Sequence, residues 1–224
     1  MVDNQINSQR TLGELLFIYF FLYLRRDLLT NMRTTRKIIQ ALAYIAYKQP
    51  DHRVNSMKAY KLLWLADRYH LRQTGRTITG DVFWALPHGV VPSDAKNVVE
   101  HQPTRIQNDE EYCNQYIQRV GKYCFKAIIE PDLMVFSDSD QVALDKILQF
   151  YGHLNQYQLE KLSHTFPEWL AYKERIEAEN TPKAYKIDQD LFFCDAKEDK
   201  SGLFVDNPEL LELTKEMFHE FTTC

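Results

Sequence analysis

The sequence predicts a mainly helical α+β fold, a compact helical domain that carries a small β-hairpin or a short sheet. Glycine is scarce, with seven in 224 residues, whereas aromatic residues make up 13% of the chain. This composition favours packed helices over a turn-rich sandwich or barrel. Apolar residues also recur at spacings of three and four, the period of a helix with one buried face. Because 45% of the chain is apolar, there is enough material for one core.

The first two helices are predicted on either side of Pro50. Over residues 34–48 the apolar side chains fall on one helical face. The next helix is predicted over residues 56–71, with the Ser56 side chain as its N-cap. Gly75 is the expected C-terminal stop, because glycine adopts the left-handed conformation without a side-chain clash. We expect these two helices to pack as a pair.

Glycine and proline break the helical period over residues 77–92. We therefore predict a short strand over residues 82–85 and a shaped loop after it. Asp81 is expected to brace the preceding turn through its carboxylate. A short helix capped by Ser93 should follow.

Residues 115–129 alternate between apolar and polar side chains. This alternation predicts a small hairpin that turns at Gly121 and Lys122. A helix over residues 110–119 is the competing interpretation of the first part of this segment.

Each later helix is preceded by a start signal. Ser137 and Asn155 are candidate N-caps, Pro167 stands at a first-turn position, and Pro208 begins the last predicted helix. The sequence shows no internal repeat and no dividing linker, so residues 32–224 are expected to form one domain.

An apolar run fills residues 15–24, which is about half the length that a helix needs to cross a bilayer. We therefore expect no membrane span. We also expect no export signal, because the charges of Asp3 and Arg10 nearly cancel and leave no basic start. A well-formed amphipathic helix follows Met32. Residues 1–31 are thus predicted to be an extension that precedes the native start, with a packing helix or a membrane-surface anchor as the alternatives.

Charge is spread unevenly along the chain. Residues 25–80 hold twelve Lys and Arg against three Asp and Glu, whereas residues 81–224 hold fourteen against twenty-six. This asymmetry indicates either a surface for nucleic acid or an acidic partner, or two halves that neutralise each other. Mutual neutralisation is favoured, because the basic residues are spaced along helices. The four cysteines are scattered without a CxxC pair, which fits a reducing cytoplasm and no zinc site.

Four stretches, in order, resemble the Panacea domain of SocA-like antitoxins. They read KLLWLADR at 61–68, TGD at 79–81, WALPHGVVP at 84–92 and LSHTFPEW at 162–169, and the resemblance spans about residues 32–193. The family's loop usually reads Gly-Pro-Val, where this chain has Gly89-Val90-Val91. The residues that we expect to hold the motif structure are Lys61, Asp67, Gly75, Gly80, Asp81, Gly89, Pro92, His164, Pro167 and Trp169.

The resemblance implies an antitoxin of a toxin–antitoxin system, without enzymatic activity or cofactor, that neutralises a partner toxin by direct contact. In some members of the family the toxin is handed to a protease, and members also occur in prophages and mobile elements. The expected partner is an adjacently encoded toxin, with a protease or a chaperone as a further partner, but fold carries over better than partner identity.

An interface needs exposed aromatic or arginine anchors. The candidate partner-binding residues are Arg68, Tyr69, Trp84 and His88, near the Gly/Pro loop. If Trp84 or Arg68 is such an anchor, Trp84→Ala or Arg68→Ala should weaken toxin neutralisation and leave the melting temperature nearly unchanged. The alternative is that the tryptophans all lie in the core.

Catalysis is not expected from the sequence. Cys113 or Cys124 with His164 would supply a nucleophile and a base, but no local signature surrounds either cysteine. Asp67 and His70 lie three apart on one helix, yet no third metal ligand is evident, so no metal site is predicted.

The alternative function is a helical DNA-binding or regulatory adapter protein. Basic residues of the first two helical segments would contact phosphates if they converged on one face. These residues are Arg36, Lys37, Lys48, Arg53, Lys58, Lys61, Arg68, Arg72 and Arg76. Against this alternative, the second helix is as apolar and aromatic as a core element.

Overall fold

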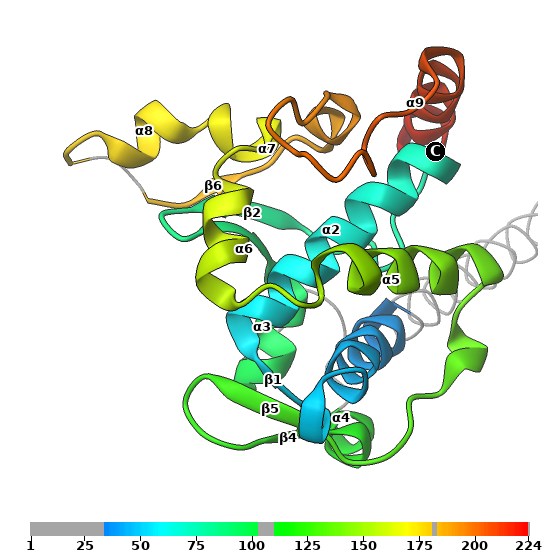
Figure 1. Ribbon diagram of the computed structural model, residues 1–224, viewed down its shortest axis with the longest axis vertical. Coiled ribbons are helices and arrows are strands. Elements are labelled where there is room, and N and C mark those ends of the chain that lie inside the picture. The colour runs from blue at the N-terminus through cyan, green and yellow to red at the C-terminus, as the bar shows by residue number, and fades with distance from the viewer. Residues whose placement is uncertain (1–33, 103–109, 181–182, 224) are drawn as a thin grey trace, which may run out of the picture.

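A computed structural model describes residues 34–102, 110–180 and 183–223. Within these ranges the fold is mainly helical, with two small antiparallel sheets, as the sequence predicts (Figure 1). The predictions for residues 1–31 lie outside the described residues. Across the described ranges, no helix is both long and apolar enough to span a bilayer.

The helices follow one another through most of the described chain. The first occupies residues 34–47. The others are α2 (Ser56–Thr74), α3 (Ser93–Glu100), α4 (Glu110–Tyr116), α5 (Asp138–Tyr151), α6 (Gln156–Ser163), α7 (Pro167–Leu170), α8 (Lys173–Glu177) and α9 (Pro208–Thr223). Short 3-10 helices lie at η1 (Pro50–His52), η2 (Leu133–Val135) and η3 (Gln189–Phe193).

Helix α2 runs through the middle of the molecule, where α5, α6, α9 and the second sheet pack around it (Figure 1). Nearly every side chain from Ala59 to Arg72 is buried, including charged ones. The N-cap is Asn55, whose side-chain oxygen accepts hydrogen bonds from the amides of Met57 and Lys58, so the prediction of Ser56 as cap is wrong by one residue. Ser56 is instead the first helical residue, and its own amide donates to a carbonyl of the neighbouring hairpin.

Gly75 ends α2 in the left-handed conformation, with a φ of 75°, as predicted. A side chain there would also collide with α9, because a Cβ atom would lie 2.9 Å from the Cβ of Met217 and from the Thr214 carbonyl oxygen. Gly75 thus ends α2 and also leaves room for α9 to pack against it.

The first sheet has the strand order β1–β5–β4, with β1 (Arg53–Asn55), β5 (Cys124–Ala127) and β4 (Ile117–Arg119). Strands β4 and β5 form the predicted hairpin around Gly121, which has a φ of 130°. The competing helix also exists in part, because α4 ends at Tyr116 and β4 begins at the next residue.

The second sheet has the order β3–β2–β6, with β2 (Phe83–Leu86), β3 (Gly89–Pro92) and β6 (Tyr185–Lys186). The predicted strand lies one residue later than expected. The expected loop after it contains a second strand, in which Trp84 pairs with Val91 across a tight turn. Strand β6 was not predicted, because its partner β2 lies about a hundred residues earlier in the chain.

Helices α5 and α6 begin at the predicted caps, Ser137 and Asn155, and both form capping boxes. Pro167 begins α7 as expected, but α7 and α8 are two helices where one was predicted. The chain turns between them because Trp169 is anchored to the second sheet through Leu86, while Tyr172 stacks on Tyr185 of β6.

Arg72 ties the C-terminal segment to α2. Its buried guanidinium donates to the carbonyl oxygens of Phe192, Cys194 and Phe204, at 3.1 Å each, and to the Asp206 carboxylate at 2.5 Å. The segment from residue 192 to 206 is therefore built into the core and is not an appendage.

Candidate functional site

Lys61 of α2 is fully buried beneath the turn between β2 and β3. Its Nζ donates a hydrogen bond of 2.6 Å to the Val90 carbonyl oxygen. Burial lowers the pKa of Lys61 to about 7, although the nearby Glu160 carboxylate opposes this shift. Gly89, with a φ of 90°, brings the turn against Lys61 and Ser163. This motif lysine thus fixes the position of the turn from below.

Asp67 of α2 holds the segment that follows the helix. Its buried carboxylate accepts hydrogen bonds from the amides of Ile78 (2.7 Å) and Thr79 (2.9 Å) and from the Thr79 hydroxyl (2.5 Å). Burial raises the pKa of Asp67 to about 6, and these hydrogen bonds act in the opposite direction. Asp67 therefore braces the turn before Gly80, the role that the sequence analysis gave to Asp81.

Asp81 instead caps α3. Its buried carboxylate accepts hydrogen bonds of 2.8 Å from the amides of Asp94 and Ala95, in the first turn of that helix. Burial raises the pKa of Asp81 to about 7. Ser93 is not the cap as predicted, because it is the first residue of α3 and the N-cap position is Pro92, which has no capping side-chain hydrogen bond. The Asp81 carboxylate accepts the first-turn amides instead. Pro92, another motif residue, is buried as the last residue of β3.

Asp81→Ala is expected to lower the free energy of unfolding by about 2–3 kcal/mol, because at least two buried first-turn amides lose their acceptor. Ser93→Ala is the matched control and should change it by less than about 0.5 kcal/mol. Urea denaturation followed by circular dichroism measures both. Equal losses in the two variants would contradict the assignment of the cap.

Arg68 is not a surface residue, so the prediction of an exposed anchor at this position is wrong. Its side chain is 0% exposed, and its Nε donates to Glu168 Oε1 at 2.9 Å. The guanidinium also lies over the rings of Phe166 and Phe204, at 4.9 and 4.5 Å. Glu168, which is also fully buried, accepts a second hydrogen bond from Trp64 Nε1 at 3.2 Å. Arg68 therefore pairs with a carboxylate a hundred residues later in the chain and does not reach solvent.

The four predicted partner-binding residues do not come together. Tyr69 is half-buried on α2 with its ring edge against Phe204, and Trp84 is half-buried on β2. Only His88 is well exposed, at the β2–β3 turn, where its Nδ1 lies 2.8 Å from Glu160 Oε1.

The last motif stretch, residues 162–169, packs against the second sheet. His164 ends α6 and stacks on Trp169, with ring centroids 4.0 Å apart. The Trp169 indole donates a hydrogen bond of 2.9 Å to the Leu86 carbonyl oxygen. These contacts fix α6 and α7 against the β2–β3 hairpin, and Pro167 begins α7 at its first turn.

Asp67 and His70 do not form the metal pair considered from the sequence. The Asp67 carboxylate is occupied by the turn, and His70 lies against the Arg76 carbonyl oxygen (2.8 Å) and Asp140 (3.2 Å). Burial lowers the pKa of His70. Across the described residues, no group of three or more His, Cys, Asp or Glu side chains is arranged to hold a metal ion.

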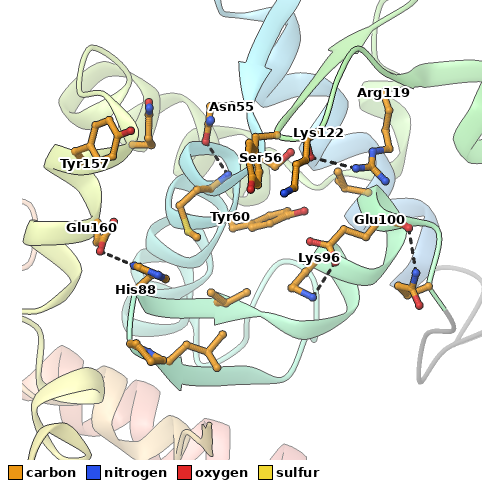
Figure 2. Close-up of a pocket in the computed structure, with 18 residues that line it drawn as sticks. Asn55, Ser56, Tyr60, His88, Lys96, Glu100, Arg119, Lys122, Tyr157 and Glu160 are labelled. Carbon is orange, nitrogen blue, oxygen red and sulfur yellow. Dashed lines mark hydrogen bonds and ion pairs between the residues drawn. The ribbon is translucent and has the colours of Figure 1, made fainter. Parts of the chain in front are cut away.

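An open groove of about 890 Å³ lies beside the β2–β3 turn. The N-terminal ends of α2 and α6, helix α3 and the turns of both hairpins surround it (Figure 2). We call it the hairpin groove. Its lining residues are Asn55, Ser56, Met57, Tyr60, Leu86, Pro87, His88, Val91, Lys96, Val99, Glu100, Gln102, Arg119, Lys122, Tyr123, Gln156, Tyr157 and Glu160.

Two tyrosines stand at the groove with most of their surface in solvent. Tyr123 is 62% exposed and Tyr157 is 67% exposed. His88 is predictable from the sequence, but these two residues are not, because they come from the β4–β5 turn and from α6, outside the four motif stretches. The one sequence signal was an aromatic residue directly after the polar turn at Gly121 and Lys122.

Comparison with known proteins gives one match. The family model described as antitoxin SocA-like, Panacea domain, matches residues 60–170, a shorter stretch than the resemblance noted above. Neither a curated protein nor a solved structure matches the chain significantly. The matched residues hold most of α2, both strands of the β2–β3 hairpin, and α3 to α7. Residues 60–170 are therefore similar to the Panacea domain of SocA-like antitoxins.

Proposed function

We propose that this chain neutralises a partner toxin by direct protein contact, and that the hairpin groove is the contact surface. The location of the groove carries the proposal. Of its 18 lining residues, all except Asn55, Ser56 and Met57 lie within the stretch that matches the antitoxin family. The stretch that matches the family model therefore supplies most of the lining of the groove.

The groove also has the surface chemistry of a protein interface. Interfaces draw much of their binding energy from a few aromatic residues that become buried on association. Tyr123 and Tyr157 are the residues that we propose for this role, because both are exposed in the free chain. Between them, apolar side chains of α2, α3 and the second sheet form the floor. Delivery of the toxin to a protease remains a prediction. In this proposal, delivery would take place after the toxin has bound at the groove.

The structure gives less support to the DNA-binding alternative. Three of the nine basic residues named for it, Lys61, Arg68 and Arg72, are fully buried. Lys37 and Arg76 both form ion pairs with Asp140, at 2.6 and 3.0 Å. These five side chains do not contribute to a basic face, and phosphate binding needs such a face.

The test is a binding and growth experiment. The toxin is the product of the small reading frame next to this gene, expressed alone and with the full chain. Tyr157→Ala and Tyr123→Ala are each expected to weaken toxin binding by about tenfold or more, the size expected of an interfacial aromatic anchor. Growth rescue should fall in parallel, while the melting temperature stays within about 2 °C because both side chains are exposed.

The matched control is Phe221→Ala on α9, an exposed aromatic residue (70%) outside the groove. It should bind the toxin as the unchanged chain does. Full binding by both tyrosine variants would place the contact elsewhere, and a neighbouring product that neither binds nor inhibits growth would remove the antitoxin proposal itself.

A further inference from the structure

The two ends of the hairpin groove carry different charges. At one end lie three cationic side chains, Lys96, Arg119 and Lys122, and one carboxylate, Glu100 (Figure 2). At the other end His88 faces Glu160. The first end therefore has excess positive charge, and the second carries a carboxylate beside a histidine.

Two of the cations are available to a partner. Lys96 is paired with Glu100 at 2.9 Å, within α3. Arg119 and Lys122 are exposed, and in the described parts of the chain neither has a carboxylate partner. Among the described residues, Arg119 donates a hydrogen bond to the Lys122 carbonyl oxygen at 3.1 Å, and the Lys122 ammonium lies 5.0 Å from the Tyr123 ring centroid. Both charges thus face the groove mouth without being neutralised.

The floor between the ends is apolar. Its apolar lining residues include Met57, Leu86, Val91 and Val99. Tyr60 lies near the cationic end (Figure 2). Burial raises the pKa of Tyr60, and Glu100 adds to the shift, so the phenol stays neutral and contributes no charge of its own. An occupant that fits this floor has apolar side chains along one side.

We infer that the hairpin groove takes an amphipathic segment of the partner toxin, with its apolar side chains on the floor and its acidic end against Arg119 and Lys122. The inference rests on the proposed function and adds the chemistry and the direction of the bound segment. The reverse direction would bring the acidic end against Glu160, where like charges repel. Charge complementarity at a rim also raises the rate of association and makes binding depend on salt.

The experiment compares two charge-reversed variants of the full chain that change the net charge equally. Arg119→Glu/Lys122→Glu alters the cationic end. Lys173→Glu/Lys197→Glu is the control, because both lysines are exposed and lie outside the groove. The dissociation constant for the same neighbouring toxin is measured at 50 mM and 500 mM NaCl, and the melting temperature of each variant is recorded.

In 50 mM NaCl the groove variant is expected to bind about tenfold more weakly, and the control within about twofold of the unchanged chain. The difference should shrink at 500 mM, and replacing the toxin's acidic residue with lysine should restore binding to the groove variant. Equal binding by both variants would overturn the inference, as would a loss that salt does not reduce. If the tyrosine variants still lose binding in that case, the groove remains the contact surface and only the acidic end is refuted.

Discussion

Arg68→Met is expected to lower the free energy of unfolding by about 3–5 kcal/mol, the cost of removing one partner of a buried ion pair. Glu168 would remain in the core with no countercharge, since it is fully buried and Arg68 Nε is 2.9 Å away. The rings of Phe166 and Phe204 would lose the cation that lies over them. A loss of this size is a large share of the stability of an ordinary domain. Urea denaturation at pH 7, followed by tryptophan fluorescence and circular dichroism, measures it.

Two further variants separate the lost ion pair from lost packing. Arg68→Met/Glu168→Leu should recover at least half of the loss, because removing both members of the pair leaves no unpaired charge in the core, although Trp64 Nε1 loses its acceptor. Arg119→Met, at an exposed arginine, should change the free energy of unfolding by less than about 0.5 kcal/mol. If Arg68→Met resembled Arg119→Met, the burial of Arg68 would be wrong and the earlier expectation of a surface anchor would return.

Gly89→Ala is expected to destabilise the chain by about 2–4 kcal/mol, since it combines backbone strain with overpacking. The residue has a φ of 90°, and a Cβ atom there would lie 1.9 Å from Ser163 Oγ and 2.7 Å from Lys61 Nζ. The turn would have to move away from α2 and α6. Because this turn forms one wall of the hairpin groove, toxin binding should weaken in the same variant.

Gly202→Ala separates the two costs. Gly202 also has a positive φ, 72°, but open space surrounds its Cβ position, so only the backbone strain of about 1 kcal/mol applies. Adding Ser163→Ala to Gly89→Ala should recover part of the loss, because the nearest clashing atom is removed. Equal denaturation midpoints for Gly89→Ala and Gly202→Ala would show that the turn is not packed as closely as described.

Local signals in the sequence were sufficient for much of the fold. The left-handed stop at Gly75, the caps at Ser137 and Asn155, and the hairpin around Gly121 each depend on neighbours within a few residues. A helix end or a tight turn shows itself through residue types at fixed offsets, and these offsets are visible in one chain.

Features that depend on distant partners could not be predicted. Asp81 caps a helix thirteen residues later, and it displaces Ser93 because the intervening hairpin folds back over α2. Arg68 finds Glu168 a hundred residues away. In the sequence these side chains look like ordinary surface charges. Hydrophobic periodicity shows which face of a helix a residue occupies, but it does not show whether an oppositely charged side chain packs against that face.

The candidate site was predicted only in part for the same reason. His88 was found because it lies in a recognisable loop, and it does line the groove. Tyr123 and Tyr157 reach the groove from two other segments, which only the folded chain brings together.

The contacts of Arg72 bear on how the chain folds as it is synthesised. Among the described residues, the acceptors of its guanidinium lie in residues 192–206, past the matched domain. One side of the central helix therefore lacks these contacts until that segment leaves the ribosome. We therefore expect nascent chains that stop near residue 170 to remain open and susceptible to proteases, although they contain the whole family motif. Completion of the native state therefore requires residues 192–206, and a fragment cut at residue 170 is not expected to be an independent folding unit.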